Sequence, residues 1–250
     1  MKWLSGHLNR KDEKMSKYLK LSVVVTMILA LCVPVAGQQE QRSGSQGRNS
    51  RGGRGYREAV DYVVKRLGLR RNSIIVDIGA GDGWWSSKMA EKLGPKGVIH
   101  AGEIEQKKVD EIKEKWESVP QIKPYLCPMD GTGLEENSCD VAFISKTYHH
   151  FKKNTHVDYL KHLKKVIKPS GKVVIIERHP SLASGRGKDH AWLPGLLGHQ
   201  AEQAGWMMLR FEMIPGSDHF MATFVDAEFF GKRLDKRLAA KKKKQSEDNR

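Results

Sequence analysis

Short apolar runs alternate with amphipathic stretches through most of the chain. The apolar runs predict buried strands over 73–78, 97–104, 124–129, 140–145 and 172–177. Apolar residues at helical spacing predict the intervening helices, over 56–67, 84–93, 106–116, 155–167 and 189–204. Two further strands are expected over 205–214 and 219–225, joined by a hairpin-like turn at 215–217.

This alternation predicts an α/β fold with a parallel sheet, because right-handed crossovers place helices on both faces of the sheet. The expected architecture is Rossmann-like: a doubly wound sheet of seven strands, mostly parallel, with the hairpin as an antiparallel closing edge. Ligands of such sheets bind at the carboxyl ends of the strands, beside the first strand. The chemistry is therefore expected in the residues that end each strand.

The N-terminal part of the chain departs from this pattern. Residues 21–33 form an apolar run that follows Lys17 and Lys20 and precedes small residues, which is typical of an export signal. We therefore expect 1–37 to be a signal peptide or an N-terminal anchor. The protein is then exported (periplasmic or secreted), or it is anchored in a membrane through residues 21–37.

The net charge of +15 is concentrated in the polar ends of the chain. Composition predicts a disordered Gly/Ser/Arg linker over 38–55 and a disordered basic tail over 232–250, which leaves 56–231 as the folded domain. Residues 57–231 hold 25 Lys and Arg against 23 Asp and Glu, so this part is nearly neutral. A basic nucleic-acid groove is not indicated, and a small-molecule partner is favoured over nucleic acid.

A glycine-rich loop, Asp77–Gly83, joins the first strand to the next helix. Its G-x-G-x-G spacing differs from the dinucleotide fingerprint, which would need glycine where Trp84 stands. Glu103 ends the second strand, where a carboxylate can accept hydrogen bonds from a ribose diol. Asp130 follows the third strand, before Gly131, and can accept from an adenine amino group or start a turn.

These motifs, with the runs at 140–151 and 163–177, resemble the class I S-adenosylmethionine-dependent methyltransferases. Within them the chain is most similar to the small methyltransferase-domain group. An exported bacterial subset of that group shares a Tyr-His-His-Phe run like 148–151 and a late motif like 218–220. The resemblance covers about 57–225, nearly all of the folded part.

The resemblance implies S-adenosylmethionine as cofactor and S-adenosylhomocysteine as product. It places the methionine end of the cofactor on the glycine-rich loop, the ribose on Glu103 and the adenine against Ile104 and Asp130. Ser145 and Lys146 would lie under the transferable methyl group. The cofactor-binding residues that it implies are Asp77, Gly79, Ala80, Gly81, Gly83, Glu103, Ile104, Asp130, Gly131 and Ser145.

Candidate catalytic residues follow the fourth strand, where the acceptor should lie. They are Tyr148, His149 and His150, and one histidine can act as a base if the acceptor carries a proton. In the alternative, one histidine caps the loop by hydrogen bonding and the other faces solvent. Glu177 and His219 are further candidates. No metal site is expected, because no single element carries ligands at metal-binding spacing.

The sequence therefore predicts an enzyme that transfers a methyl group from S-adenosylmethionine to an unidentified acceptor, with a small molecule favoured. One alternative is methylation of RNA or protein, with the basic ends supplying salt-sensitive attachment. Another is a binding protein that kept the fold without catalysis, since a fold does not prove activity.

Overall fold

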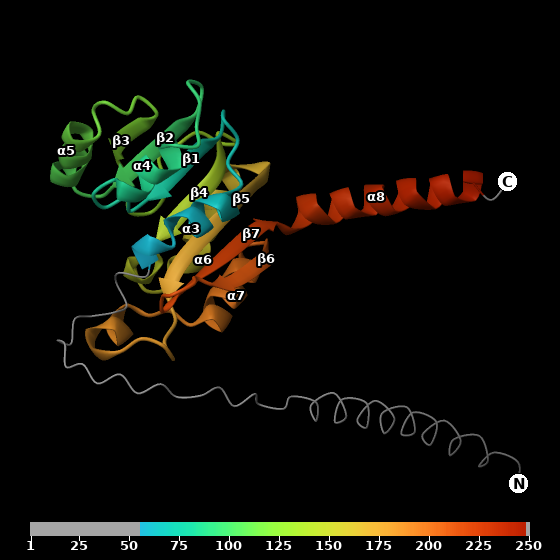
Figure 1. Cartoon of the computed structure of the whole chain (residues 1–250). Coiled ribbons are helices and arrows are strands. Elements are labelled where there is room, and N and C mark those ends of the chain that lie inside the picture. The colour runs from blue at the N-terminus through green and yellow to red at the C-terminus, as the bar shows by residue number, and fades with distance from the viewer. Residues whose placement is uncertain (1–55, 249–250) are drawn as a thin grey trace, which may run out of the picture. The chain divides into compact units, whose positions relative to one another are not determined.

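The computed structural model describes residues 56–248 (Figure 1). The expected signal segment at 1–37 and the linker at 38–55 lie outside the described residues. Within the described range, no helix has both the length and the apolar character needed to cross a bilayer.

Strands and helices alternate along the described chain, as the apolar pattern predicts. In chain order the elements are α3 (Val60–Leu67), β1 (Ile74–Ile78), α4 (Trp84–Ala90), β2 (Val98–Glu103), α5 (Gln106–Lys115), β3 (Ile122–Leu126), β4 (Cys139–Ser145), the 3₁₀ helix η1 (Tyr148–His150), α6 (His156–Val166), β5 (Ile167–Arg178), the 3₁₀ helix η2 (Gly185–His190), α7 (Pro194–Gln203), β6 (Trp206–Met213), β7 (His219–Asp226) and α8 (Ala227–Asp248).

The strands form one 7-stranded sheet in the order β3-β2-β1-β4-β5-β7-β6. Strands β1 to β5 pair in parallel, and β7 runs antiparallel to both β5 and β6. The strand order reverses between β1 and β4, which is the switch point where such sheets bind ligands. The expected doubly wound, mostly parallel sheet is confirmed. Within the closing hairpin, it is β7 that pairs with β5, so β6 forms the edge.

Helices cover both faces of the sheet. Helices α3, α4 and α5 bury apolar residues against one face, and α6 and α7 against the other. Ile75 belongs to the first core and its neighbour Val76 to the second, since successive side chains of a strand point to opposite faces. Strand β4 is buried along its whole length, as a central parallel strand should be.

Two strand boundaries differ from the expected ones. Strand β3 begins at Ile122 and ends at Leu126, earlier than expected. Strand β5 begins at Ile167, five residues before the expected start at residue 172, with an irregularity in its pairing to β4. Gly171 allows this close approach, because a Cβ there would lie 2.7 Å from the Asp140 carbonyl oxygen.

The prediction of a disordered tail at 232–250 is wrong for most of that stretch. That part belongs to helix α8, drawn in red in Figure 1. Alanine, leucine, lysine and arginine dominate this stretch, and all four favour helix. Glu228 and Lys232 add an ion pair one turn apart. Leu234 and Leu238 are 48% and 50% exposed, so this helix buries little apolar surface there.

Candidate functional site

The loop after β1 is anchored to β2 by its backbone. The amides of Gly79 and Ala80 both donate to the carbonyl oxygen of Gly102, at 3.0 Å each. Gly79 and Gly81 have φ of +70° and +63°, in the left-handed region that favours glycine. At Gly79 a Cβ would lie 2.4 Å from Thr147 Cγ2, whereas at Gly81 it would meet no atom of the described residues within 4 Å. The loop is therefore packed on one side and open at Gly81.

Glu103 faces this opening from the end of β2. Its carboxylate is buried, and Oε1 accepts a hydrogen bond from the Gly81 amide at 2.6 Å. Oε2 accepts from the Ile104 amide at 3.3 Å. Each carboxylate oxygen has two lone pairs, so Glu103 can also accept bonds from a ligand's hydroxyl groups.

Asp77 supports the loop from behind. It is buried, and its Oδ2 accepts a hydrogen bond from the Ser86 hydroxyl of α4 at 2.6 Å. Burial raises the pKa of Asp77 to about 7, and the nearby Glu103 charge adds to this effect. Gly83 is also structural, because a Cβ there would lie 2.7 Å from the Trp116 ring. Asp77 and Gly83 hold the loop on α4 and do not line the opening.

A cavity of about 590 Å³ lies at the carboxyl ends of β1, β2 and β4. Its walls come from the glycine-rich loop, the residues after β2, β3 and β4, and the start of α6. The lining residues are Ile78, Gly79, Gly81, Gly102, Glu103, Ile104, Glu105, Lys108, Cys127, Pro128, Met129, Ser145, Lys146, Thr147, His150, Phe151, Lys152 and Tyr159. A cavity of this size at the switch point can hold a small ligand.

The cavity contains half of the expected cofactor-binding residues. Gly79, Gly81, Glu103, Ile104 and Ser145 line it. The other expected residues, Asp77, Ala80, Gly83, Asp130 and Gly131, lie outside the lining set.

The segment after β3 lines the cavity with residues other than the expected Asp130 and Gly131. Cys127, Pro128 and Met129 line the cavity, and Gly131 is buried, with its carbonyl oxygen accepting from the Tyr159 hydroxyl at 3.1 Å. Met129 and Ile104 are 74% and 55% exposed, which is unusual for large apolar side chains beside a cavity. These two side chains offer an apolar surface to a planar ring.

Lys146 follows β4 with a strained backbone. Its φ is +54°, which a non-glycine residue rarely adopts, and its amide donates to the Ile176 carbonyl oxygen at 2.8 Å. Its Nζ lies 5.1 Å from the centroid of the Tyr56 ring. Burial lowers the pKa of Lys146, and the charges of Arg57 and Arg178 add to the shift. Lys146 is exposed and lines the cavity, so its positive charge is accessible to a ligand there.

Tyr56 connects this strand end to the closing hairpin. Its hydroxyl forms a hydrogen bond with the Ser145 hydroxyl, and its ring stacks on His219 with centroids 4.6 Å apart. Burial lowers the pKa of His219 to about 4, although Asp218 Oδ1 lies 2.9 Å from its Nδ1. His219 is therefore a neutral packing residue behind the cavity wall.

The three candidate catalytic residues after β4 have different environments. Tyr148 is buried in the core, where its hydroxyl donates to Gln200 Oε1 at 3.0 Å. His149 donates from Nδ1 to Oε2 of the buried Glu177, at 2.8 Å, and from its amide to Oε1 at 3.3 Å. His150 is exposed and lines the cavity. Its pKa is lowered by partial burial first and then by His149 and a further histidine, His190.

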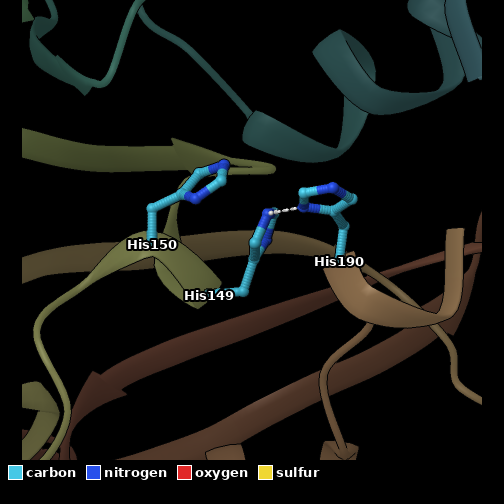
Figure 2. A group of neighbouring side chains, drawn as sticks. All are labelled: His149, His150 and His190. Carbon is cyan, nitrogen blue, oxygen red and sulfur yellow. Dashed lines mark hydrogen bonds between the residues drawn. The ribbon is translucent and has the colours of Figure 1, made fainter. Parts of the chain in front are cut away.

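His190 was not selected from the sequence. It ends η2, and its Nδ1 lies 3.2 Å from His149 Nε2. Figure 2 shows the imidazoles of His149, His150 and His190 converging from two separate 3₁₀ helices. One ring nitrogen from each lies within 4.8 Å of the others. Spacing along one element could not reveal this group, because the fold assembles it from residues far apart in the chain.

The chain is similar to known proteins in sequence and in fold. Residues 75–171 match the family model described as a methyltransferase domain. The chain is similar to the demethylmenaquinone methyltransferases of several Staphylococcus aureus strains, with 24% identity over 183 residues. That alignment covers 69% of this chain and 74% of the relative.

The fold is similar to that of a SAM-dependent methyltransferase from Aquifex aeolicus, with a TM-score of 0.61 and 22% identity over 66% of this chain and 88% of the other. It is also similar to the 1,6-didemethyltoxoflavin-N1-methyltransferase of Burkholderia thailandensis, with a TM-score of 0.54 and 17% identity over 68% and 77% of the two chains. The crystal structure of the latter contains bound 1,6-didemethyltoxoflavin and S-adenosylhomocysteine.

Proposed function

We propose that this chain is a class I S-adenosylmethionine-dependent methyltransferase and that it methylates a small molecule through a hydroxyl or thiol group. The observation that carries the proposal is the single cavity shared by two sets of residues. One set is the loop with Glu103 and Ile104, and the other is Lys146 and His150. The first set suits the cofactor and the second an acceptor beside it.

The residues of the first set fit S-adenosylmethionine. The open space at Gly81 lets a ligand approach the backbone, and Glu103 presents a carboxylate that suits the ribose diol. Ile104 and Met129 offer apolar contact to the adenine ring. When bound, S-adenosylmethionine supplies an activated methyl group on a positively charged sulfur.

The residues of the second set act on the acceptor. Methyl transfer needs alignment of donor and acceptor and exclusion of water more than it needs a strong acid or base. Lys146 lines the cavity with an exposed side chain, and its positive charge favours an acceptor whose oxygen or sulfur is anionic when it attacks. Phe151 and Tyr159 supply apolar walls that orient the acceptor.

A small acceptor is supported by the size of the cavity and by the names of similar proteins. The cavity volume of about 590 Å³ suits small ligands. The similar proteins are named for a demethylmenaquinone and for 1,6-didemethyltoxoflavin. The described part of the chain has its long basic stretch on α8, and that helix contributes no lining residue to the cavity.

The test is methyl transfer from S-adenosylmethionine labelled in its methyl group. The full chain is incubated separately with small phenols and thiols, with RNA and with protein, and Glu103→Gln serves as the impaired variant. We expect label in a small molecule only, and loss of that label with Glu103→Gln. Label in RNA or protein would overturn the small-molecule acceptor. Cofactor binding with no transfer to any class would favour a binding protein without catalysis.

A further inference from the structure

We propose that His149, His150 and His190 form a binding site for a divalent transition metal ion, of the class of Zn²⁺, at the acceptor end of the cavity. The three ring nitrogens lie within 4.8 Å of one another. Figure 2 shows that the rings face a common space between η1 and η2. Of these three residues, the methyltransferase reaction proposed above involves only His150, as part of the cavity wall beside the acceptor.

Two of the ligands already have the spacing that a metal ion requires. Zn²⁺ binds histidine nitrogen at about 2.0–2.1 Å in tetrahedral geometry, which sets neighbouring nitrogens roughly 3.3 Å apart. His149 Nε2 and His190 Nδ1 are 3.2 Å apart. His150 is exposed, and its ring centroid lies 4.0 Å from that of His149, so a side-chain rotation can complete the set.

The buried Glu177 on β5 provides an independent second observation. Its Oε2 accepts from His149 Nδ1 at 2.8 Å, and Glu177 is 0% exposed. This bond fixes the imidazole with its Nε2 lone pair directed at His190. Histidines that bind metals commonly donate their other nitrogen to a carboxylate in this way. Without metal, a proton on His190 Nδ1 can occupy the gap between the two rings, and a cation would replace that proton.

The ligand set indicates which metals fit. Three imidazoles suit Zn²⁺, and also Fe²⁺, Ni²⁺ or Cu²⁺, better than Mg²⁺ or Ca²⁺, which prefer oxygen ligands. Three protein ligands also leave an open coordination position, as in catalytic rather than structural zinc sites. His150 lines the cavity, so a metal held by this cluster lies at the cavity wall.

A role for the metal rests on the proposed function. An acceptor hydroxyl or thiol bound at the open position loses its proton to water, because the cation stabilises the anion. The acceptor lone pair then forms a bond to the methyl carbon while the carbon–sulfur bond of the cofactor breaks. The electron pair of that bond stays on sulfur, which leaves as the neutral sulfide of S-adenosylhomocysteine.

The experiment is a metal titration of the full chain after treatment with a chelator. We expect one equivalent of Zn²⁺ to bind, and Co²⁺ to bind in its place with the visible absorption of a four-coordinate site. His190→Ala should weaken Zn²⁺ binding at least tenfold, and Glu177→Gln by about 10–100-fold. His199→Ala is the matched control, since His199 is an exposed histidine on α7, and it should bind Zn²⁺ as the wild type does.

Equal Zn²⁺ affinity of His190→Ala and His199→Ala would overturn the metal site, as would the absence of stoichiometric binding. His190 is exposed at the end of η2, so its substitution does not open the core. S-adenosylhomocysteine titration of the same variants separates the two proposals. Retained cofactor binding without a metal site refutes only the metal proposal, whereas a metal site without cofactor binding refutes only the methyltransferase cavity.

Discussion

Glu103 Oε1 accepts a hydrogen bond from the Gly81 amide at 2.6 Å, so the carboxylate expected to hold the ribose also holds the glycine-rich loop. The two roles are compatible, because a carboxylate accepts several hydrogen bonds at once. The loop therefore has its binding shape before the cofactor arrives. Preorganisation of this kind reduces the ordering cost of binding.

The two glycines of the loop should respond differently to substitution by alanine. A left-handed backbone costs a non-glycine residue about 1–2 kcal/mol, so both variants lose stability. Gly79→Ala should lose more, because its Cβ would lie 2.4 Å from Thr147 Cγ2, while the Cβ at Gly81 projects into open space. Urea unfolding measures the difference, and Thr147→Ala should rescue part of the Gly79→Ala defect. Equal losses without rescue would contradict the packing assigned to Gly79.

Asp77 should make the folded chain less stable as pH rises from about 4 to 7. Burial raises its folded pKa to about 7, so the folded state binds a proton there that the unfolded state has released. A shift of this size corresponds to a few kcal/mol, at about 1.4 kcal/mol per pKa unit. Asp77→Asn should remove this dependence and be more stable than wild type at pH 8. Asp158→Asn, at an exposed aspartate on α6, is the control. If the free energy of unfolding depended on pH in the same way for wild type and for Asp77→Asn, the raised pKa of Asp77 would be refuted.

His219 should change the stability of the fold with pH in the opposite direction to Asp77, over an overlapping pH range. Burial lowers its folded pKa to about 4, so its contribution is present above the unfolded value of about 6.5 and is lost as pH falls toward 4. His219→Phe keeps an aromatic ring against Tyr56 and cannot be protonated. We expect it to lose less stability than wild type between pH 6.5 and 4.5, measured by thermal unfolding. A greater acid sensitivity of the variant would show that His219 is charged in the fold.

Export is tested at the N-terminus of the protein isolated from cells. The apolar run at 21–33 and the small residues after it predict cleavage near Gln38. Mass spectrometry of the intact chain should then find a form that begins near that residue, outside the cytoplasm. A chain that still contains residues 21–33 would contradict cleavage and leave the membrane anchor as the remaining proposal.

The parts of the site that follow strand ends in a fixed way could be predicted from the sequence. The loop at Gly79 and Gly81 and the carboxylate of Glu103 lie within or next to their own strands, so local pattern sets their positions. The segment after β3 shows why other positions could not be predicted. Because β3 ends at Leu126 and not at residue 129, Cys127–Met129 meet the cavity in place of Asp130.

Long-range assembly explains the remaining differences. His190 reaches His149 only because the chain after β5 returns over η1 through η2, and no local pattern encodes that path. Glu177 is recognisable as a strand-end acid, but its pairing with His149 depends on how β5 is placed beside η1. Helix α8 has the composition of a charged tail, and helix propensity rather than burial explains it.

Calorimetric titration of the full chain with S-adenosylhomocysteine tests the central claim most directly. We predict saturable binding at one site, weakened in Glu103→Gln by about 1–3 kcal/mol, the usual loss for a hydrogen bond to a charged group. Glu114→Gln, at an exposed glutamate on α5, should bind as the wild type does. Absence of binding by the folded wild-type chain, or equal binding by Glu103→Gln, would contradict the assignment of this cavity to the cofactor.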